Sequence, residues 1–337
     1  MTAIRLALLG VDHVHAFSMT ASLLREGAEL VAFDGGSLAE VFARAYSGAR
    51  RASADEILAD PRVDLVLCAA VPDRRADLAI RALEAGKHVL VDKPGAVSLA
   101  QLDALRAAQR SAGLRFGVYF SERIENAATE RALALVRGGA IGRVHHLELQ
   151  GPHRLGLVPR PDWFFDAARS GGILADLASH AADQLLCFTG ETQFEVVAAR
   201  VVAQHPDHPG LETLGCVLFA GAAATGYARV DWWTPAGLPS WGDARLFVIG
   251  TEGTLEVRKN LDVAGRAGEG HLLLVDATGT RHEQVTGPSG FAAAYLRDLA
   301  QGTETALPTD HCLRATELAL RAQAAAKRSP ATLRTGP

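Results

Sequence analysis

Short apolar runs alternate with helical patterns through the first 120 residues, and this alternation constrains the fold more than any other feature. Runs of strand length occupy residues 4–9, 29–33, 64–70, 88–91 and 114–119. Between them, apolar residues recur at the spacing of an amphipathic helix. Strands separated by helices form parallel βαβ units. We therefore expect an α/β domain with a doubly wound parallel sheet, whose ligand crevice lies at the carboxyl ends of the strands.

The pattern changes after residue 122, where the apolar runs become longer and alternate with polar residues. Such alternation predicts antiparallel strands with one covered face. We expect two domains, a nucleotide-binding domain over residues 1–122 and an α+β domain with a large, mainly antiparallel open sheet over residues 123–337. Strands are expected at 143–150, 195–203, 214–219, 225–230, 244–249, 254–258 and 272–275, and helices at 126–137, 173–189, 291–301 and 312–326. The free face of the open sheet is available for a partner subunit, as in a homodimer or homotetramer.

Composition narrows the class of partner. The chain has 34 Lys and Arg against 38 Asp and Glu, a net charge of −4, so it lacks the basic excess that nucleic-acid binding requires. No apolar run approaches the roughly 18–20 residues of a membrane span, and residues 4–9 resemble a first strand rather than a signal peptide. The four cysteines are scattered in apolar stretches, which fits a reducing cytoplasm rather than a disulfide framework. We therefore expect a cytoplasmic protein with a small-molecule ligand.

The turn after the first expected strand, residues 10–15, departs from a dinucleotide-binding fingerprint. That fingerprint has glycines at the first, third and sixth positions, and here only Gly10 fits, since Asp12 and His15 occupy the other two. The supporting residue is Asp34, at the end of the second expected strand. A carboxylate there accepts hydrogen bonds from the adenosine ribose and repels a 2′-phosphate, which favours NAD over NADP. The alternative for Asp34 is a plain turn residue before two glycines.

His13 and His15 allow two interpretations. Two histidines at alternate positions after a buried strand can face one divalent metal, with Asp12, His153, Asp176 or His180 completing the site. Alternatively they hydrogen-bond a phosphate or the substrate, or cap the following helix. We favour the second interpretation and expect no metal.

Lys93 follows the strand expected at 88–91 and precedes Pro94, which restricts the backbone at the carboxyl edge of the sheet. A lysine at this edge is within reach of a nicotinamide and a substrate. The alternative is a solvated turn lysine.

A second polar set opens the helix expected at 173–189. Asp176 and His180 are four residues apart and would share one helix face, after the pair Gly171-Gly172. Histidine is the natural base near neutral pH, and the glycines permit close approach of a backbone or ligand. The alternative is that this polar stripe is only the solvated side of an amphipathic helix.

Three motifs together resemble one family. They are Asp92-Lys93-Pro94, the pattern Gly171-Gly172-x-x-x-Asp176-x-x-x-His180, and the turn Gly250-Thr251-Glu252-Gly253. Over nearly the whole chain the sequence resembles the glucose–fructose oxidoreductase/inositol dehydrogenase (Gfo/Idh/MocA) family. The departures are the loop at 10–15 and Asp92, where glutamate is commoner.

The resemblance implies an N-terminal Rossmann domain, NAD as cofactor and a sugar, cyclitol or related polyol as substrate. It implies Lys93, Asp176 and His180 as the catalytic residues. The residues expected to bind the cofactor are Gly10, Asp12, His13, His15, Asp34, Pro72, Lys93 and Pro94.

Substrate-side candidates lie mostly on loops and strand ends of the second domain. Aromatic rings stack on the apolar faces of sugars, and arginine or histidine can hydrogen-bond hydroxyls. The tryptophans are equally consistent with core or subunit contacts, and residues 160–163 could form a substrate flap. The candidates are Arg123, His153, Arg154, Trp163, Trp232 and Trp233, together with His180.

These residue types suit oxidation of an alcohol. His180 would take the hydroxyl proton, Asp176 would orient His180, and Lys93 would stabilise the developing alkoxide. Three alternatives remain open. The first is a redox-neutral enzyme that keeps its NAD and cleaves glycosides or eliminates a group through transient oxidation. The others are a metal-dependent hydrolase using His13 and His15, and a non-catalytic NAD-binding sensor.

Overall fold

The chain divides into two compact units in a computed structural model that describes residues 3–157 and 160–328. Unit 1 comprises Met1–Arg131, Ala168–Gly171 and Thr286–Glu317, and unit 2 comprises Ala132–Ala167, Gly172–Val285 and Leu318–Pro337. A segment from the far end of the sequence therefore belongs with the N-terminal unit.

Unit 1 is built on a six-stranded parallel sheet with the order β3-β2-β1-β4-β5-β6. The strand order reverses between β1 and β4, which defines a doubly wound sheet with a crevice at that point. Every side chain of β4 is buried, as its continuous apolar run requires. The strands are β1 (Arg5–Val11), β2 (Glu29–Phe33), β3 (Arg50–Arg51), β4 (Leu65–Ala69), β5 (His88–Asp92) and β6 (Phe116–Tyr119).

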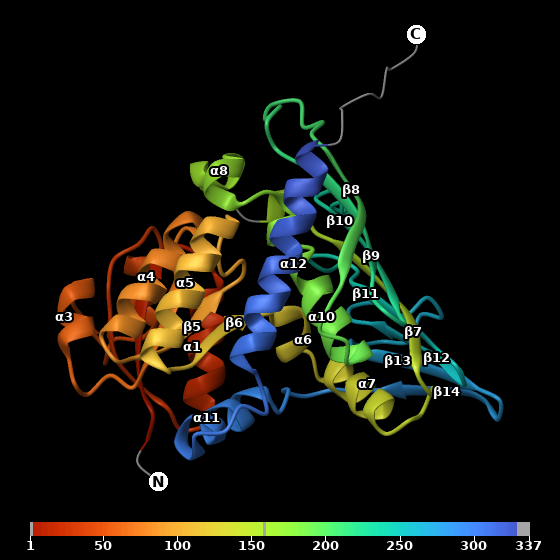
Figure 1. The fold of residues 1–337 in the computed structure, drawn as a ribbon, viewed down its shortest axis with the longest axis horizontal. Helices are drawn as coiled ribbons and strands as arrows, with labels where there is room; N and C mark the ends of the chain where they lie inside the picture. Colours follow the sequence, from red (N-terminus) through yellow and green to blue (C-terminus); the bar gives the residue numbers. More distant parts are fainter. Residues whose placement is uncertain (1–2, 158–159, 329–337) are drawn as a thin grey trace. The chain divides into compact units, whose positions relative to one another are not determined.

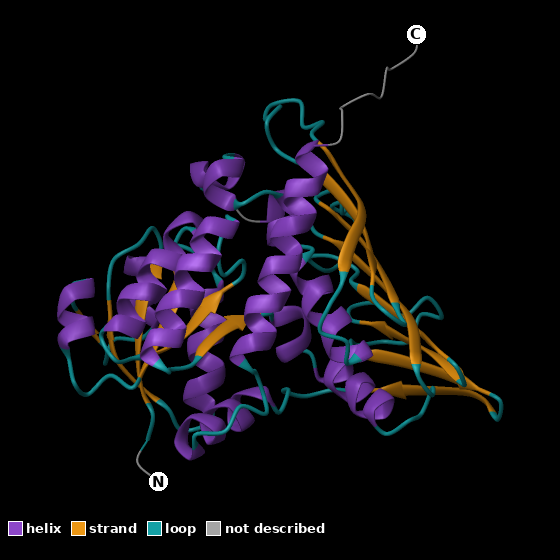
Figure 2. Cartoon of the chain, viewed as in Figure 1, coloured by secondary structure: helices purple, strands orange, loops and turns teal. Residues whose placement is uncertain are grey.

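Helices cover both faces of this sheet (Figure 2). Right-handed crossovers in the two directions of winding place α1 and α2 on one face and α4 and α5 on the other. Short helices are held by local caps, as at Ser53, whose side chain and that of Glu56 form a reciprocal capping box. The helices are α1 (His15–Arg25), α2 (Ala39–Ala45), α3 (Ala54–Ala59), α4 (Pro72–Glu84), α5 (Leu99–Ala112), α6 (Ser121–Ile124) and α11 (Phe291–Gln301).

Unit 2 contains an eight-stranded sheet with the order β14-β13-β12-β11-β7-β10-β9-β8 (Figure 1). Only β7 and β10 pair in parallel, and all other neighbours are antiparallel. The predicted mainly antiparallel sheet is therefore confirmed. The strands are β7 (Val144–Pro152), β8 (Glu195–Val202), β9 (Leu214–Ala220), β10 (Thr225–Asp231), β11 (Arg245–Gly250), β12 (Gly253–Arg258), β13 (His271–Asp276) and β14 (Gly279–Gln284).

Two helices, α9 (Ile173–Asp176) and α10 (Ser179–Thr189), pack on the central strands of the second sheet. Helices α7 (Ala127–Arg137) and α12 (Thr309–Arg328) contribute residues to both units. The remaining short segments are α8 (Ala167–Ser170) and the 3₁₀ turns Leu155–Leu157 and Asp162–Phe165.

Two strands, β3 and β14, carry no apolar run and were not expected. Each lies at one edge of its sheet and has a single neighbour. Both residues of β3 are exposed arginines, and no residue of β14 is buried. Because these edge strands are held by backbone hydrogen bonds rather than by buried side chains, they leave no hydrophobic pattern.

No helix in the described part of the chain is long and apolar enough to cross a membrane.

Candidate active site

Gly10 occupies a position in the β1–α1 loop that only glycine can take. Its φ is +67°, and a Cβ on it would lie 2.2 Å from the Cβ of Ala70 at the end of β4. The Gly10 amide donates a 2.5 Å hydrogen bond to Oδ1 of Asp34. The ends of β1, β2 and β4 are thereby joined at the carboxyl edge of the sheet, where a dinucleotide binds in a doubly wound fold.

Asp12 turns its carboxylate toward the β2–α2 loop, where Oδ1 accepts the Ser37 amide at 2.7 Å. This contact gives the residue at the second glycine position a structural partner. Burial raises the pKa of Asp34 to about 6, and the neighbouring charge of Asp12 adds to the shift while the Gly10 amide opposes it.

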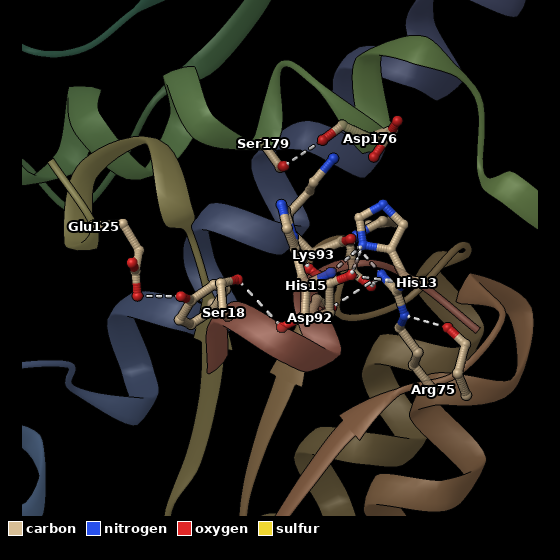
Figure 3. A network of polar contacts seen from close by, with 12 residues as sticks. His13, His15, Ser18, Arg75, Asp92, Lys93, Glu125, Asp176 and Ser179 are labelled. Carbon is tan, nitrogen blue, oxygen red and sulfur yellow. Dashed lines mark hydrogen bonds and ion pairs between the residues drawn. The ribbon is translucent and has the colours of Figure 1, made fainter. Parts of the chain in front are cut away.

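Asp92, at the end of β5, is the centre of a buried polar cluster (Figure 3). Its Oδ2 lies 2.9 Å from Nδ1 of His13, and its Oδ1 lies 2.7 Å from Nδ1 of His15. Nη2 of Arg75 also lies 2.9 Å from Oδ2. Burial opposes ionisation, but Arg75 and the two imidazoles hold the pKa of Asp92 well below its usual range. Asp92 is thus a buried carboxylate anion with three cationic or N–H partners.

The two histidines and Asp92 are close enough to be considered as a metal site, since their ligand atoms lie within 4.8 Å of one another. The geometry is instead that of hydrogen bonds, because each imidazole contacts a different carboxylate oxygen. Arg75 adds a fixed positive charge at one of these oxygens. Asp12, one of the residues that could have completed a metal site with His13 and His15, instead accepts a hydrogen bond from the amide of Ser37.

Arg75 also fixes the backbone that carries Lys93. Its Nε donates to the carbonyl of Ala70 at 2.8 Å, and Nη1 reaches the carbonyls of Asp92 (3.2 Å), Lys93 and Pro94 (3.4 Å). The Lys93–Pro94 peptide is cis, and both Lys93 and Pro94 are buried. A solvated turn lysine is therefore excluded. Pro72 is buried as the first residue of α4, at the carboxyl end of β4.

In unit 2, Gly172 begins the segment that carries Asp176. Its φ is +87°, and a Cβ there would lie 2.5 Å from Nε2 of Gln323. The amide of Ile173 donates to Glu212 and the amide of Leu174 donates to Gln323, both at 2.8 Å. These long-range caps satisfy the amides that a helix start leaves without intrahelical partners.

The continuous helix expected at 173–189 is wrong, because the chain breaks between α9 and α10. The Ser179 hydroxyl donates to the carbonyl of Asp176 at 2.8 Å, and the amide of His180 bonds the carbonyl of Leu177 instead. A serine hydroxyl that bonds a nearby carbonyl competes with the helical ladder, which explains the break. Asp176 and His180 therefore lie on two consecutive helical segments rather than on one face of a single helix.

His180 is buried, and so are Asp183 and Gln184, which follow it on α10. The alternative that this polar stripe is only the solvated side of a helix is therefore excluded. Asp176 is half-buried. Buried titratable groups of this kind are typical of functional sites.

The substrate-side candidates fall in different surroundings. Arg123 is buried in α6, at the carboxyl end of β6. The ring of His153 packs against Trp232 and Trp241, with centroids 5.3 and 4.6 Å away. The guanidinium of Arg154 bonds the carbonyls of Pro235 and Leu238. Trp163 is buried, whereas Trp233 is 52% exposed.

Arg160 was not among the single residues proposed, although it lies in the expected flap. Its guanidinium stacks over Phe164 at 4.7 Å and over Trp232 at 5.2 Å. Burial lowers its pKa, and the charge of Asp176 opposes that shift. Arg160 thus brings a cation–π stack into the surroundings of Asp176 within unit 2.

The sequence also did not predict two roles in this cluster. Asp92 contacts both histidines, and Arg75 is the counter-ion of Asp92. Arg75 lies on α4, and no local spacing relates it to Asp92 or to the loop at 10–15. Only the adjacency of β1, β4 and β5 in the sheet brings these residues together.

The fold and motifs match known proteins over most of the chain. Residues 4–120 match the profile of the oxidoreductase family with an NAD-binding Rossmann fold, and residues 129–256 match the GFO/IDH/MocA C-terminal domain. A crystal structure from Erwinia carotovora atroseptica SCRI1043 is 39% identical, with a TM-score of 0.92 over 96% of this chain and 98% of that one. The chain therefore belongs to the Gfo/Idh/MocA family of oxidoreductases, and its N-terminal domain is an NAD-binding Rossmann domain.

Curated relatives match over shorter segments. The 1,5-anhydro-D-fructose reductase of Ensifer adhaerens is 32% identical over 43% of this chain and 44% of its own length. The levoglucosan dehydrogenase of Pseudarthrobacter phenanthrenivorans is 30% identical over 52% of this chain and 46% of its own length. This chain thus spans less than half of the length of either relative. A solved levoglucosan dehydrogenase, in complex with NADH and levoglucosan, shares the fold at 18% identity, with a TM-score of 0.81 over 97% of this chain and 98% of that one.

The residues at the sheet edge fit the nucleotide of this family. Gly10 lets the β1–α1 loop pass against Ala70, where a Cβ would collide, and Asp34 stands at the end of β2, the position at which this fold commonly holds a ribose. Val14 precedes α1 and offers no capping side chain, but Nδ1 of His13 lies 3.3 Å from the amide of His15, the first residue of the helix.

Proposed function

We propose that this protein transfers a hydride between a hydroxyl-bearing carbon of a sugar, cyclitol or related polyol and NAD. The observation that carries the proposal is the position of Lys93, which Arg75 holds at the carboxyl end of β5 in an NAD-binding domain. The two curated relatives named above act on sugar derivatives, by their names, which supports the same class of substrate.

Three side chains have separate catalytic roles in this proposal. His180 takes the hydroxyl proton, Asp176 orients and stabilises His180, and Lys93 donates a hydrogen bond to the substrate oxygen. Bound NAD supplies the hydride acceptor. Buried polar groups suit this role, because their interactions with developing charge are stronger away from water.

We propose NAD rather than NADP as the cofactor. Asp34 places a carboxylate at the end of β2, and the next three residues, 35–37, contain no arginine to hold a 2′-phosphate. Gly10, Pro72 and Pro94 shape the same edge of the sheet, and Asp12 supports the loop through Ser37.

On the substrate side, Trp163 and His153 are proposed to bind the sugar in unit 2. Arg154 bonds backbone carbonyls through its guanidinium, so its proposed effect on the substrate is exerted through the loop at 235–238. Arg123, at the carboxyl end of β6, is proposed to act from unit 1.

A panel of sugars, anhydro sugars and cyclitols with added NAD tests this proposal. We expect NADH absorbance to rise with at least one of them. Lys93→Ala and His180→Ala should each lower kcat by about 10²- to 10⁴-fold while NADH still binds. An exposed lysine outside the site, Lys327, gives the matched control Lys327→Ala. Product formation without NADH would instead favour the redox-neutral alternative. Near-wild-type rates in both Lys93→Ala and His180→Ala would overturn the catalytic roles proposed for these residues.

A further inference from the structure

The carboxylate of Asp92 has both oxygens engaged inside the protein. Oδ1 faces His15, and Oδ2 faces His13 and Arg75. Asp92 and Arg75 are 0% and 1% exposed, so this end of each imidazole is closed to solvent. Neither histidine is used by the reaction proposed above.

The contacts fix which nitrogen of each ring carries a proton. A carboxylate oxygen at 2.7–2.9 Å from Nδ1 requires a proton between the two atoms, so Nδ1 donates in both rings. The His15 amide also lies 3.3 Å from Nδ1 of His13, but this longer contact is the weaker one. In a neutral imidazole with Nδ1 protonated, Nε2 is a hydrogen-bond acceptor.

Burial lowers the pKa of His13 to about 4, although Asp92 opposes the shift, so this ring is neutral near neutral pH. The His13 and His15 side chains nevertheless remain 19% and 23% exposed. Since Nδ1 faces the buried carboxylate, Nε2 is directed away from it. The ring centroids lie 4.5 Å apart, so the two acceptors belong to one small site.

An acceptor pair selects its ligand. Phosphate oxygens need donors, which a neutral Nε2 cannot supply. A metal ion is disfavoured by the guanidinium of Arg75 beside the same carboxylate. Hydroxyl groups are donors, so they match imidazole Nε2 acceptors and need no opposite charge.

We propose that His13 and His15 form a diol-binding site, in which the two Nε2 atoms accept hydrogen bonds from neighbouring hydroxyl groups of a bound ligand. The diol belongs either to a ribose of the dinucleotide or to the polyol substrate. This inference rests on the proposed function for the identity of the polyol, and Asp92 acts in it as a positioning residue.

Replacing each histidine by asparagine or by glutamine tests the roles of Nδ1 and Nε2 separately. The amide of asparagine reaches the position of Nδ1 and keeps the contact with Asp92. The amide of glutamine reaches the position of Nε2 and keeps an acceptor for the ligand. We therefore expect His13→Asn and His15→Asn to lose the diol contact and His13→Gln and His15→Gln to retain most of it.

The first arm measures Kd for NADH and for AMP, which lacks the nicotinamide-side ribose, by calorimetry with the full chain. If that ribose is the ligand, each asparagine variant binds NADH about 2- to 12-fold more weakly, the glutamine variants recover most of the affinity, and AMP binding is unchanged. Melting curves of all four variants establish that they are folded.

The second arm measures KM for the most active polyol of the panel. A rise in KM in the asparagine variants alone, with NADH affinity unchanged, assigns the diol to the substrate. If wild-type protein oxidises no polyol, the proposed function fails, and NADH binding alone decides the present inference.

Two results would overturn the diol-binding site. One is equal behaviour of the asparagine and glutamine variants, or no effect in either arm. The other is about one zinc ion per chain in the purified protein, measured by elemental analysis, that is lost from both kinds of variant.

Discussion

Arg75 and Asp92 form an ion pair that is closed to solvent. Water therefore cannot take the place of either side chain when it is removed. Arg75→Met would leave the Asp92 anion without its guanidinium and the carbonyls of residues 92–94 without their donor. Breaking a buried ion pair from one side costs about 3–5 kcal/mol, so we expect a loss of this size in the free energy of unfolding. Urea denaturation measures it.

The matched control is Arg81→Met on the same helix. Arg81 pairs with Asp55 at the surface, where the two side chains are 44% and 87% exposed. Such pairs are worth about 0–1 kcal/mol, so this variant should unfold close to wild type. Equal losses in the two variants would contradict the structural role assigned to Arg75.

We predict that Asp34 makes nucleotide binding sensitive to pH. With its pKa raised to about 6, the carboxylate becomes protonated as pH falls below that value, and a neutral acid is a weaker acceptor than an anion. We expect NAD to bind about 3- to 10-fold more weakly at about pH 5 than at about pH 7.5. Calorimetry across this range measures the change.

Asp34→Asn is the control for this pH effect, since it cannot ionise. Its affinity for NAD should be low and nearly constant across the same range. A profile as steep as that of wild type would mean that another group causes the change.

Among the elements, α9 is held in place by side chains distant in sequence. Glu212 accepts the amide of Ile173, and it also bonds Gln323, which accepts the amide of Leu174. Glu212→Ala removes a cap worth about 0.5–2 kcal/mol and frees the segment that carries Asp176. We expect that loss in stability together with a fall in kcat, measured by denaturation and by NADH formation.

Glu191→Ala is the comparison. Glu191, in the loop between α10 and β8, likewise accepts two backbone amides, but these belong to Ala222 and Ala223 in the β9–β10 turn. The Glu191→Ala variant should lose about as much stability as Glu212→Ala but keep the kcat of the wild type. If kcat fell equally in both variants, the cap of Glu212 would have no particular link to the site.

The elements that could be predicted from the sequence are those whose side chains are buried. The run at 64–70 predicted β4 because every residue of that strand is covered. Edge strands β3 and β14 could not be found in this way, since their side chains are exposed. The break between α9 and α10 depends on one serine hydroxyl, which the apolar spacing of the segment does not reveal.

The same limit applies to the site. Lys93 could be proposed as a site residue because the end of a parallel strand is a known place for ligand contacts. The partnership of His13, His15 and Arg75 through Asp92 requires the strand order, because these residues come from three separate segments. The sequence shows that these residues are polar and titratable, but it does not show that they contact one another.

At the scale of the whole molecule, the second sheet has a face on which apolar and polar residues mix. Val217 and Phe219 are buried on one side of β9, so Leu218 between them lies on the other, where it is 37% exposed. Leu218 pairs with Tyr227, which shares that face. We propose that this face joins subunits, and we expect Leu218→Glu to lower the molar mass seen by light scattering.

The substitution Val41→Glu, at an exposed apolar position of α2 in unit 1, controls for added charge. It should leave the molar mass unchanged. A wild-type protein that is already monomeric would contradict assembly through this face.

The central claim is hydride transfer from a polyol carbon to NAD, and isotope transfer tests it most directly. The most active polyol, deuterated at the oxidised carbon, is incubated with the protein and NAD, and the NADH formed is analysed by mass spectrometry. We predict one deuterium in each NADH, and its loss from the reaction when Lys93 or His180 is replaced by alanine. Oxidised product accompanied by unlabelled NADH, or by none, would contradict the account.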